Sequence, residues 1–509
     1  MLLTLVAAAV AAPAAEVLRC LELSDLACAQ EAAAQLGRAP ADLAARAELA
    51  FSLGEFAEAR ELDTALGGGG SVSPEQARRS GLYELTAEAT ADFATVRRGD
   101  VTLRYRPGMD EVLVDEALET LQAAHDRIAP LLGGAPPGGV RMELYPTAQR
   151  FIDASSLPAA AVRNTGVIAL SKWTRLLVSS PRALGHGYAW KDTIAHEYIH
   201  YVVAWRSLDK TPVWLQEGIA RSHESLWNLD APPPLAPLHQ SLLADALAND
   251  TLVPLARMHP SMAFLDSGEQ ASLAFAQVST MVQYLRQVAG NDAVSRVLDL
   301  VRDDRDALQA VADVGAAGDV AAFMAGWRAY LGGMDLVKKK LAAAPTLLDG
   351  PNDEIAADPV LGRRTDLAKY ARLGDILFDA GRPDAALVEY GKAQDPGTGP
   401  SPVLSARTAE ALLATGRAAE ARAALEASIA DYPEYAVTRA ALAKLLLAQG
   451  NVTGALVHYR AAADVDPFDP ETQGALADLF AATGNPSRAE RHARYQRILQ
   501  SAEAAAPSR

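Results

Sequence analysis

The stretch from Lys191 to Glu224, KDTIAHEYIHYVVAWRSLDKTPVWLQEGIARSHE, decides how the rest of the chain is interpreted. It contains the pattern His-Glu-x-x-His, formed by His196, Glu197 and His200. The apolar residues around the pattern have helical spacing, so we expect a helix there. Positions i and i+4 of a helix lie on one face, one turn apart. Two imidazoles so placed can bind one metal ion, and the carboxylate beside the first can reach a water at that ion.

A third ligand, Glu217, is expected on the next helix. The first helix should end near Arg206, and Thr211 with Pro212 should begin a second helix after a short turn. If the two helices pack antiparallel, His200 and Glu217 lie at the same distance from the turn, roughly 9 Å at 1.5 Å per residue. The sequence therefore predicts a His/His/Glu set, which suits one zinc ion with an open fourth position for water.

These motifs resemble those of the gluzincin zinc metallopeptidases, whose third ligand is a Glu on the following helix. The segment at 212–220, PVWLQEGIA, is similar in particular to the peptidase MA-like family. The resemblance implies an α+β zincin-like catalytic domain in which zinc polarises a peptide carbonyl and Glu197 acts as general base. The sequence differs from the metzincin pattern, because Val203 and Arg206 stand where that group has Gly and a third His.

A second donor to the oxyanion is expected beside the metal, and the sequence offers three candidates. These are Tyr188, His223 and Tyr284. The peptidase MA-like family often has an Ala-Tyr pair near the start of a later helix, where this chain has Ala274-Phe275. If that tyrosine hydroxyl holds the oxyanion in relatives, Phe275 cannot do so here.

The C-terminal part of the chain repeats with a fixed period. Gly381, Gly416, Gly450 and Gly484 are spaced by 35, 34 and 34 residues, and an Ala-rich segment follows each of them. This period is typical of tetratricopeptide repeats, so we expect about four of them in an all-α solenoid. Such arrays bind peptides or partner proteins on a concave face.

The other segments differ in composition, and together they suggest five regions. We expect a signal peptide at 1–15, a helical, repeat-like region at 16–94 with a Gly-rich linker at 67–71, the metallopeptidase domain at 95–335, a linker at 336–366 and the repeats at 367–502. The first segment is a short apolar run that ends in small residues, as secretory signals do. Before the Gly-rich linker we expect two or three Ala-rich helices.

Within the metallopeptidase domain, strands should precede the metal-binding helix and helices should follow it. Alternating or apolar runs predict strands at 101–105, 140–145, 166–170 and 174–178. The last strand is expected beside the cleft, where zincins commonly hold an extended substrate by main-chain pairing. Proline-rich residues 228–262 should be irregular, and helices should follow at 271–288, 293–302, 308–314 and 320–331.

Charge and cysteine content restrict the partners and the compartment. The net charge of −16 argues against nucleic acid and against anionic membrane surfaces as partners. No run is long and apolar enough for a membrane-spanning helix. The signal favours export to a bacterial periplasm or beyond, with a cytoplasmic location as the alternative. Cys20 and Cys28, the two cysteines, can stay free or form a disulfide, which export favours.

Two function classes remain compatible with these patterns. The first is an exported zinc peptidase that acts on a peptide or protein substrate and whose repeats recruit that substrate or a protein partner. The second is a zinc-binding scaffold without turnover, in which the repeats mediate protein–protein interaction. Glu197 favours the first class, because a ligand set alone does not need a general base.

Overall fold

The structure is a computed structural model that describes residues 13–66, 73–159, 162, 167–258, 262, 265–343 and 353–505. Residues 13–15, at the end of the expected signal peptide, already belong to the first helix. The rest of that segment and the expected Gly-rich linker at 67–71 lie outside the described residues.

Five helices precede the sheet. They are α1 (Pro13–Glu22), α2 (Leu26–Ala33), α3 (Pro40–Leu53), α4 (Phe56–Leu66) and α5 (Pro74–Ala89). Four of them lie before residue 67, so the expectation of two or three helices there was wrong. Asp25 accepts a hydrogen bond from the Cys28 amide at the start of α2, and Gly54 ends α3 with a φ of 81°. The composition of this Ala-rich stretch favours helix throughout, and these caps determine where the separate helices begin and end. Cys20 and Cys28 form a disulfide between α1 and α2.

A five-stranded mixed sheet forms the centre of the next region. Its strands are β1 (Ala94–Arg98), β2 (Val101–Tyr105), β3 (Val140–Tyr145), β4 (Ala169–Lys172) and β5 (Arg175–Ser179). The order is β1-β2-β3-β5-β4, with β2, β3 and β5 parallel and the two outer strands antiparallel. β2 and β3 have the predicted bounds, whereas β1 was not predicted. The last predicted strand corresponds to β5, which is paired on both sides. The strand at that edge of the sheet is therefore β4.

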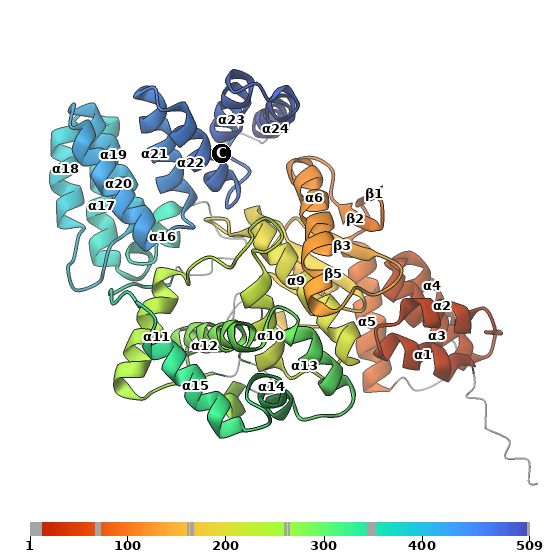
Figure 1. The fold of residues 1–509 in the computed structure, drawn as a ribbon. Coiled ribbons are helices and arrows are strands. Elements are labelled where there is room, and N and C mark those ends of the chain that lie inside the picture. Colours follow the sequence, from red (N-terminus) through yellow and green to blue (C-terminus); the bar gives the residue numbers. More distant parts are fainter. Residues whose placement is uncertain are drawn as a thin grey trace, which may run out of the picture.

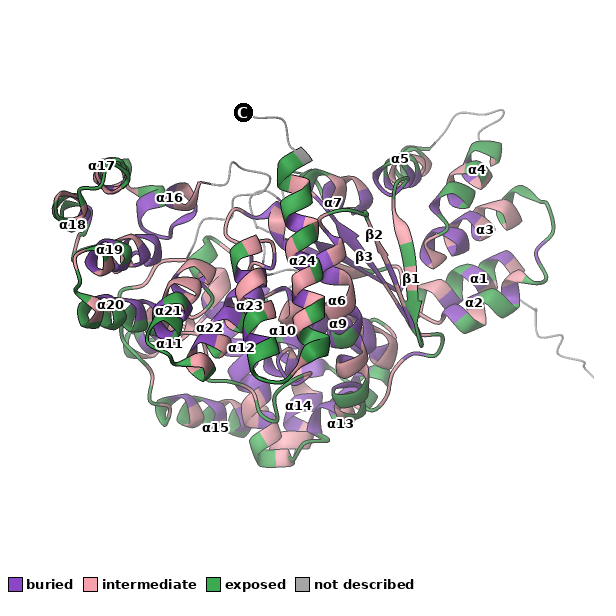
Figure 2. Cartoon of the chain, turned by 90° about the horizontal axis from the view of Figure 1, so that it is seen from above, coloured by how far each residue is buried: buried purple, intermediate pink, exposed green. Residues whose placement is uncertain are grey.

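Successive side chains of a strand face opposite sides of a sheet, and both sides of this sheet are covered. Leu176 and Val178 pack into the main core with α6 (Glu111–Arg127) and α9 (Trp190–Ser207). Leu177, between them, packs on the other side with α7 (Ala148–Ala154). Figure 2 shows α6 and α9 on one side of the strands and the N-terminal helices on the other.

The helical half below the sheet shares the same core. It comprises α10 (Val213–His223), α11 (Pro237–Asn249), α12 (Gly268–Ala289), α13 (Ala293–Arg302), α14 (Ala307–Gly315) and α15 (Val320–Gly332). The last four confirm the predicted helices. α11 contradicts the expected irregular segment, because Pro237 occupies the first turn, where a proline is tolerated. No single helix among the described residues is long and apolar enough to cross a membrane; α14 and α15 meet that test only together, bent by 73°.

The repeat region begins after the short helix α16 (Glu354–Ala357) and consists of four helix pairs. These are α17 (Thr365–Asp379) with α18 (Pro383–Lys392), α19 (Pro402–Ala414) with α20 (Ala418–Asp431), α21 (Ala436–Ala448) with α22 (Val452–Ala463), and α23 (Pro470–Ala482) with α24 (Pro486–Ala505). The four periodic glycines follow the first helix of each pair and have φ values between 71° and 79°. This left-handed conformation explains why the period is marked by glycine. In Figure 1 the pairs lie in sequence above helices α10 to α15.

Candidate metal centre

The structure brings His196, His200 and Glu217 together between α9 and α10. The Nε2 atoms of the two imidazoles are 3.0 Å apart. Glu217 Oε2 lies 3.4 Å from Nε2 of His196, and Glu217 Oε1 lies 3.6 Å from Nε2 of His200. Four donors at zinc-bond lengths in a tetrahedron are roughly 3.3–3.5 Å apart. The donor types and the spacing therefore fit one zinc ion without rearrangement of the helices.

The backbone between the two helices explains how the three side chains meet. Leu208 and Asp209 both have left-handed φ values, 52° and 57°, and they form the tight turn after α9. Pro212, and not Thr211 as predicted, is the residue that precedes the first turn of α10. Gly218 follows Glu217, and a Cβ there would lie 2.7 Å from the carbonyl oxygen of Val278 on α12. Because Gly218 has no side chain, α12 can pack directly against α10 next to Glu217.

Glu224, at the end of α10, orients the first imidazole. Its Oε2 lies 2.8 Å from Nδ1 of His196, and both of its oxygens are 3.4 Å from Nη1 of Arg221. A carboxylate on one ring nitrogen leaves the other nitrogen free to bind a metal. Sequence reasoning gave Glu224 no role. The available signal was its position seven residues after Glu217, which is two helical turns along the same face.

Glu197 is buried beside the ligands, with 6% of its surface exposed. Burial raises the pKa of Glu197 to about 7, Glu217 adds to this effect, and His196 opposes it. The amide of Ser171, on edge strand β4, also opposes it through a hydrogen bond. A divalent cation at the ligands would lower this pKa, because a nearby positive charge favours the carboxylate. The side chain is thus suited to accept and release a proton near neutral pH.

Burial and mutual contacts shift the pKa values of the three candidate ligands in different directions. Burial lowers the pKa of His200 to about 4. It acts in the same direction on His196, but hydrogen bonds to Glu217 and Glu224 raise that pKa to about 9. Burial alone would raise the pKa of Glu217, yet His200 and His196 bring it to about 2. The carboxylates therefore stay ionised around the site, as cation ligands must be.

The three candidate oxyanion donors lie in different surroundings. Tyr188 donates its hydroxyl proton to the carbonyl oxygen of Ser179 at 2.5 Å. His223 is fully buried, with Nδ1 2.9 Å from the carbonyl oxygen of Ile219. The ring of Tyr284 packs against Phe323 and Tyr330 of α15. The structure does not bring His223 or Tyr284 into a hydrogen bond with a ligand residue among the residues described.

Phe275 lies on α12 close to the ligand-bearing helix. The guanidinium carbon of Arg221 is 5.2 Å from the centre of its ring. This distance allows a cation–π contact. A positive charge therefore stands over the ring of Phe275, and sequence reasoning gave Arg221 no role.

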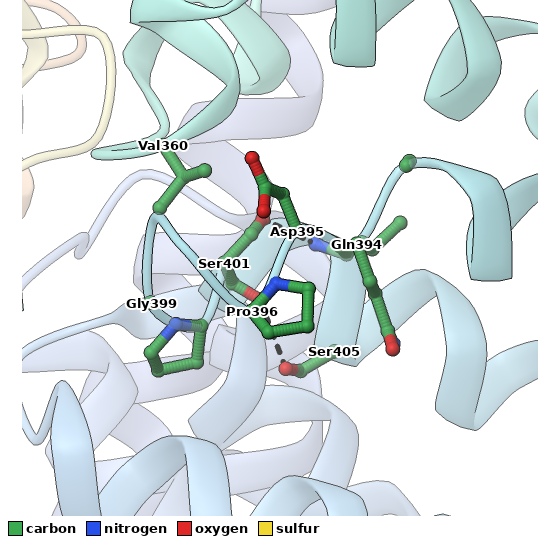
Figure 3. Close-up of a pocket in the computed structure, with 10 residues that line it drawn as sticks. Val360, Gln394, Asp395, Pro396, Gly399, Ser401 and Ser405 are labelled. Atoms are coloured by element: carbon green, nitrogen blue, oxygen red, sulfur yellow. Dashed lines mark hydrogen bonds between the residues drawn. The ribbon is translucent and has the colours of Figure 1, made fainter. Parts of the chain in front are cut away.

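Two other features are less suited to catalysis. A cavity of about 400 Å³ lies between α18 and α19 (Figure 3). Two of its polar side chains already have partners: Asp395 accepts from Arg364 at 2.9 Å, and Ser405 donates to the carbonyl oxygen of Ser401 at 2.9 Å. Within the described ranges, the other group of three possible metal ligands is Glu16 with Cys20 and Cys28, whose sulfurs are joined.

Comparison with protein families identifies two parts of the chain. A model of the Peptidase MA superfamily matches residues 120–333, and a tetratricopeptide repeat model matches residues 377–445. The chain therefore carries a peptidase MA superfamily domain followed by tetratricopeptide repeats. This is the architecture that the motifs and the 34-residue period predicted.

Matches to individual proteins are weak. No curated protein matches the chain. A crystal structure of MamA is 17% identical with a TM-score of 0.24, over 30% of this chain and 88% of that one. MamA from Desulfovibrio magneticus RS-1 is 19% identical with a TM-score of 0.24, over 28% and 79%. Yeast LTA4 hydrolase in complex with bestatin is 12% identical with a TM-score of 0.29, over 80% and 67%. Scores this low support no argument about function.

Proposed function

We propose that the chain is a zinc-dependent peptidase of the gluzincin type that hydrolyses peptide bonds. The observation that carries this proposal is the convergence of His196, His200 and Glu217, whose ligand atoms lie within 4.8 Å of one another. A second carboxylate, Glu197, is buried next to them without being one of the three ligands. The peptidase MA superfamily match over the same helices supports the assignment.

Each residue of the site has a defined part in such a reaction. When bound, zinc would lower the pKa of its water toward about 7 and would polarise the scissile carbonyl. Glu197 accepts the proton of the attacking water and passes it to the leaving amine. Glu224 keeps the proton of His196 on Nδ1, so that Nε2 faces the ligand centre. The outer edge of β4, beside α9, can pair with the main chain of an extended substrate.

A zinc-binding scaffold without turnover is the alternative, and one observation favours it. Phe275 cannot donate a hydrogen bond to an oxyanion, and the hydroxyl of Tyr188 is already bonded to a main-chain carbonyl. In that case the site would hold zinc for stability, and the tetratricopeptide repeats would supply the function by binding a protein partner.

Metal analysis combined with peptide-library cleavage tests the proposal. We expect about one zinc per chain, cleavage that a chelator abolishes, and recovery on addition of zinc. Glu197→Gln should keep zinc and lose cleavage, whereas Glu269→Gln, an exposed carboxylate at the start of α12, should keep both. Cleavage at the parent rate by Glu197→Gln would remove Glu197 from the mechanism. A zinc-loaded parent that cleaves no peptide would transfer the assignment to the scaffold.

We also propose that the chain is exported, and the Cys20–Cys28 disulfide supports this location. Disulfides persist in oxidising compartments and are rare in the cytoplasm. Cell fractionation with mass-spectrometric mapping of the N-terminus tests it. A chain that starts at Met1 and is recovered with cytoplasmic markers would favour the cytoplasmic alternative.

A further inference from the structure

The first helix pair of the repeats has an open side. In the later pairs, the first helix packs against the second helix of the pair before it, as α19 does against α18, α21 against α20 and α23 against α22. α17 belongs to the first pair, so no earlier pair of the described repeats lies on the corresponding side of it. Figures 1 and 2 both show α17 and α18 at the outer end of the array. A helix from another molecule can therefore reach this side of α17.

The period of the repeats shows which residues of α17 form this side. Ile376 stands five residues before the first periodic glycine. The same position in the later pairs holds Ala411, Leu445 and Leu479. These three side chains are between 0% and 4% exposed, whereas Ile376 is 64% exposed. The position is thus a buried contact wherever an earlier pair precedes it, and it is open in α17.

A second apolar residue of α17 shows the same difference. Leu373 is 42% exposed, whereas its counterparts in the third and fourth pairs, Leu442 and Leu476, are 2% and 0% exposed. Leu373 and Ile376 are three residues apart, so they share one face of the helix. The terminal repeat of a soluble array usually has a polar outer face. Two bulky aliphatic side chains on this face therefore indicate a surface that a partner covers.

The charges beside these two residues are complementary to a second copy of the same helix. Lys369 lies one turn before Leu373, and Asp379 lies one turn after Ile376. Both are exposed, and neither forms an ion pair with another residue in the described part of the chain. If two copies of α17 pack antiparallel across the apolar residues, Lys369 of each copy lies near Asp379 of the other. A two-fold interface requires a self-complementary surface of this kind.

The other charges near this face do not oppose such a pairing. Arg372, at its edge, is already bonded to Asp353 at 2.6 Å. Arg382, in the turn after α17, would lie opposite the start of α17 in the second copy. Asp366 stands there, 2.7 Å from Arg364. Opposite charges therefore meet at both ends of the paired helices.

The far end of the array is already covered within the chain. Arg491 of α24 forms two hydrogen bonds to Glu119 of α6, of 2.9 and 2.6 Å. Leu499, which is 1% exposed, belongs to the same core as α6. This contact blocks head-to-tail stacking of the first repeat of one copy on the last repeat of another. Contact between two first repeats closes as a two-fold dimer instead.

We propose that Leu373 and Ile376 form the centre of a homodimer interface in which the α17 helices of two copies pack antiparallel. The second copy then supplies the apolar cover that an earlier pair supplies in the later repeats. The inference is independent of the proposed peptidase function, because the candidate metal ligands lie on α9 and α10 and not on α17.

Analytical ultracentrifugation of the full chain over a concentration series tests the inference. We expect the parent to dimerise, and Ile376→Glu to raise the dimer dissociation constant by about tenfold or more, because a charge would be buried in the apolar centre. Val457→Glu is the matched control, since Val457 on α22 is 56% exposed and lies outside the interface. It should leave the constant unchanged, and both variants should keep the helix content of the parent in circular dichroism.

A charge swap tests whether the partner is a second copy in the antiparallel orientation. Lys369→Glu should raise the dissociation constant by about fivefold, because the pair with Asp379 occurs twice in the dimer. Addition of Asp379→Lys to the same chain should restore the parent value, and absence of this rescue overturns the antiparallel pairing. A parent that stays monomeric at all concentrations overturns the proposal and makes another protein the occupant of this face. A dimer that is insensitive to Ile376→Glu overturns it as well, because its interface then lies elsewhere.

Discussion

Glu224 gives the most direct test of how the metal ligands are oriented. It bonds Nδ1 of His196 at 2.8 Å, while Nε2 of the same ring faces Glu217 at 3.4 Å. With a carboxylate at Nδ1 the ring keeps its proton there, and the lone pair on Nε2 remains free for a metal. Replacement of Glu224 should therefore weaken zinc binding although no ligand is removed.

The size of the effect depends on what replaces the carboxylate. Partners of this kind contribute about 10- to 100-fold to metal affinity, or roughly 1.4–2.7 kcal/mol. Glu224→Gln keeps an oxygen that can accept from Nδ1, so only the charge is lost and we expect about a tenfold weaker affinity. Glu224→Ala also removes the acceptor and leaves the ring free to change tautomer, so we expect a loss of about 100-fold. His196→Ala should exceed both, because a ligand itself is lost.

Competition with a chromogenic chelator measures the zinc dissociation constant of each variant. Arg221→Met is the matched control, because it removes the ion pair to Glu224 at 3.4 Å but keeps the hydrogen bond to His196. Its dissociation constant should change less than that of Glu224→Gln. If Glu224→Ala binds zinc as tightly as the parent, His196 is not oriented through Nδ1, and the geometric reasoning for this site is refuted.

Three further predictions concern stability. Gly218→Ala should cost about 1–3 kcal/mol in denaturant unfolding and weaken zinc binding, because α10 must move away from α12; Gly391→Ala, on an open helix face, should be neutral or stabilising. Glu143→Ala should cost about 3–5 kcal/mol in the same assay, since it leaves buried Arg175 without its carboxylate at 3.0 Å. Burial raises the pKa of Asp192 to about 7, so its protonated form is favoured in the folded state and stability falls as pH rises from about 4 to about 7. Asp192→Asn should therefore raise the melting temperature more at about pH 8 than at about pH 5, and equal gains would contradict this cause.

The parts of the site that could be predicted depend on local spacing. The two imidazoles are four residues apart on one helix, and the third ligand lies on the next helix, after one short loop. Helix geometry and this loop therefore fix most of the distances within the site. The repeats were equally accessible, because each periodic glycine marks a backbone conformation that other residues avoid. In both cases the spacing that matters is between residues close together in the sequence, so it can be read without knowledge of the tertiary fold.

The parts that could not be predicted depend on contacts between distant segments. Strand β1 has a largely exposed pattern and is held by its hairpin with β2, so no buried face marked it in the sequence. The pairing of Arg491 with Glu119 joins residues 372 positions apart. Arg221 and Glu224 lie in the stretch that identified the site, yet their roles follow from the rotation of α10 against α9 and α12. Spacing alone does not set that rotation.

The two function classes differ most at Glu197. Its carboxylate is 6% exposed and is not one of the three converging ligands, and burial raises its pKa to about 7. Burying an ionisable group away from water is costly unless the charged form is compensated. A site that only stores zinc gains nothing from this cost, since three ligands already hold the ion. A hydrolase requires such a group, because the attacking water must lose a proton and the leaving amine must gain one. The buried carboxylate therefore weighs more toward catalysis than Phe275 weighs against it.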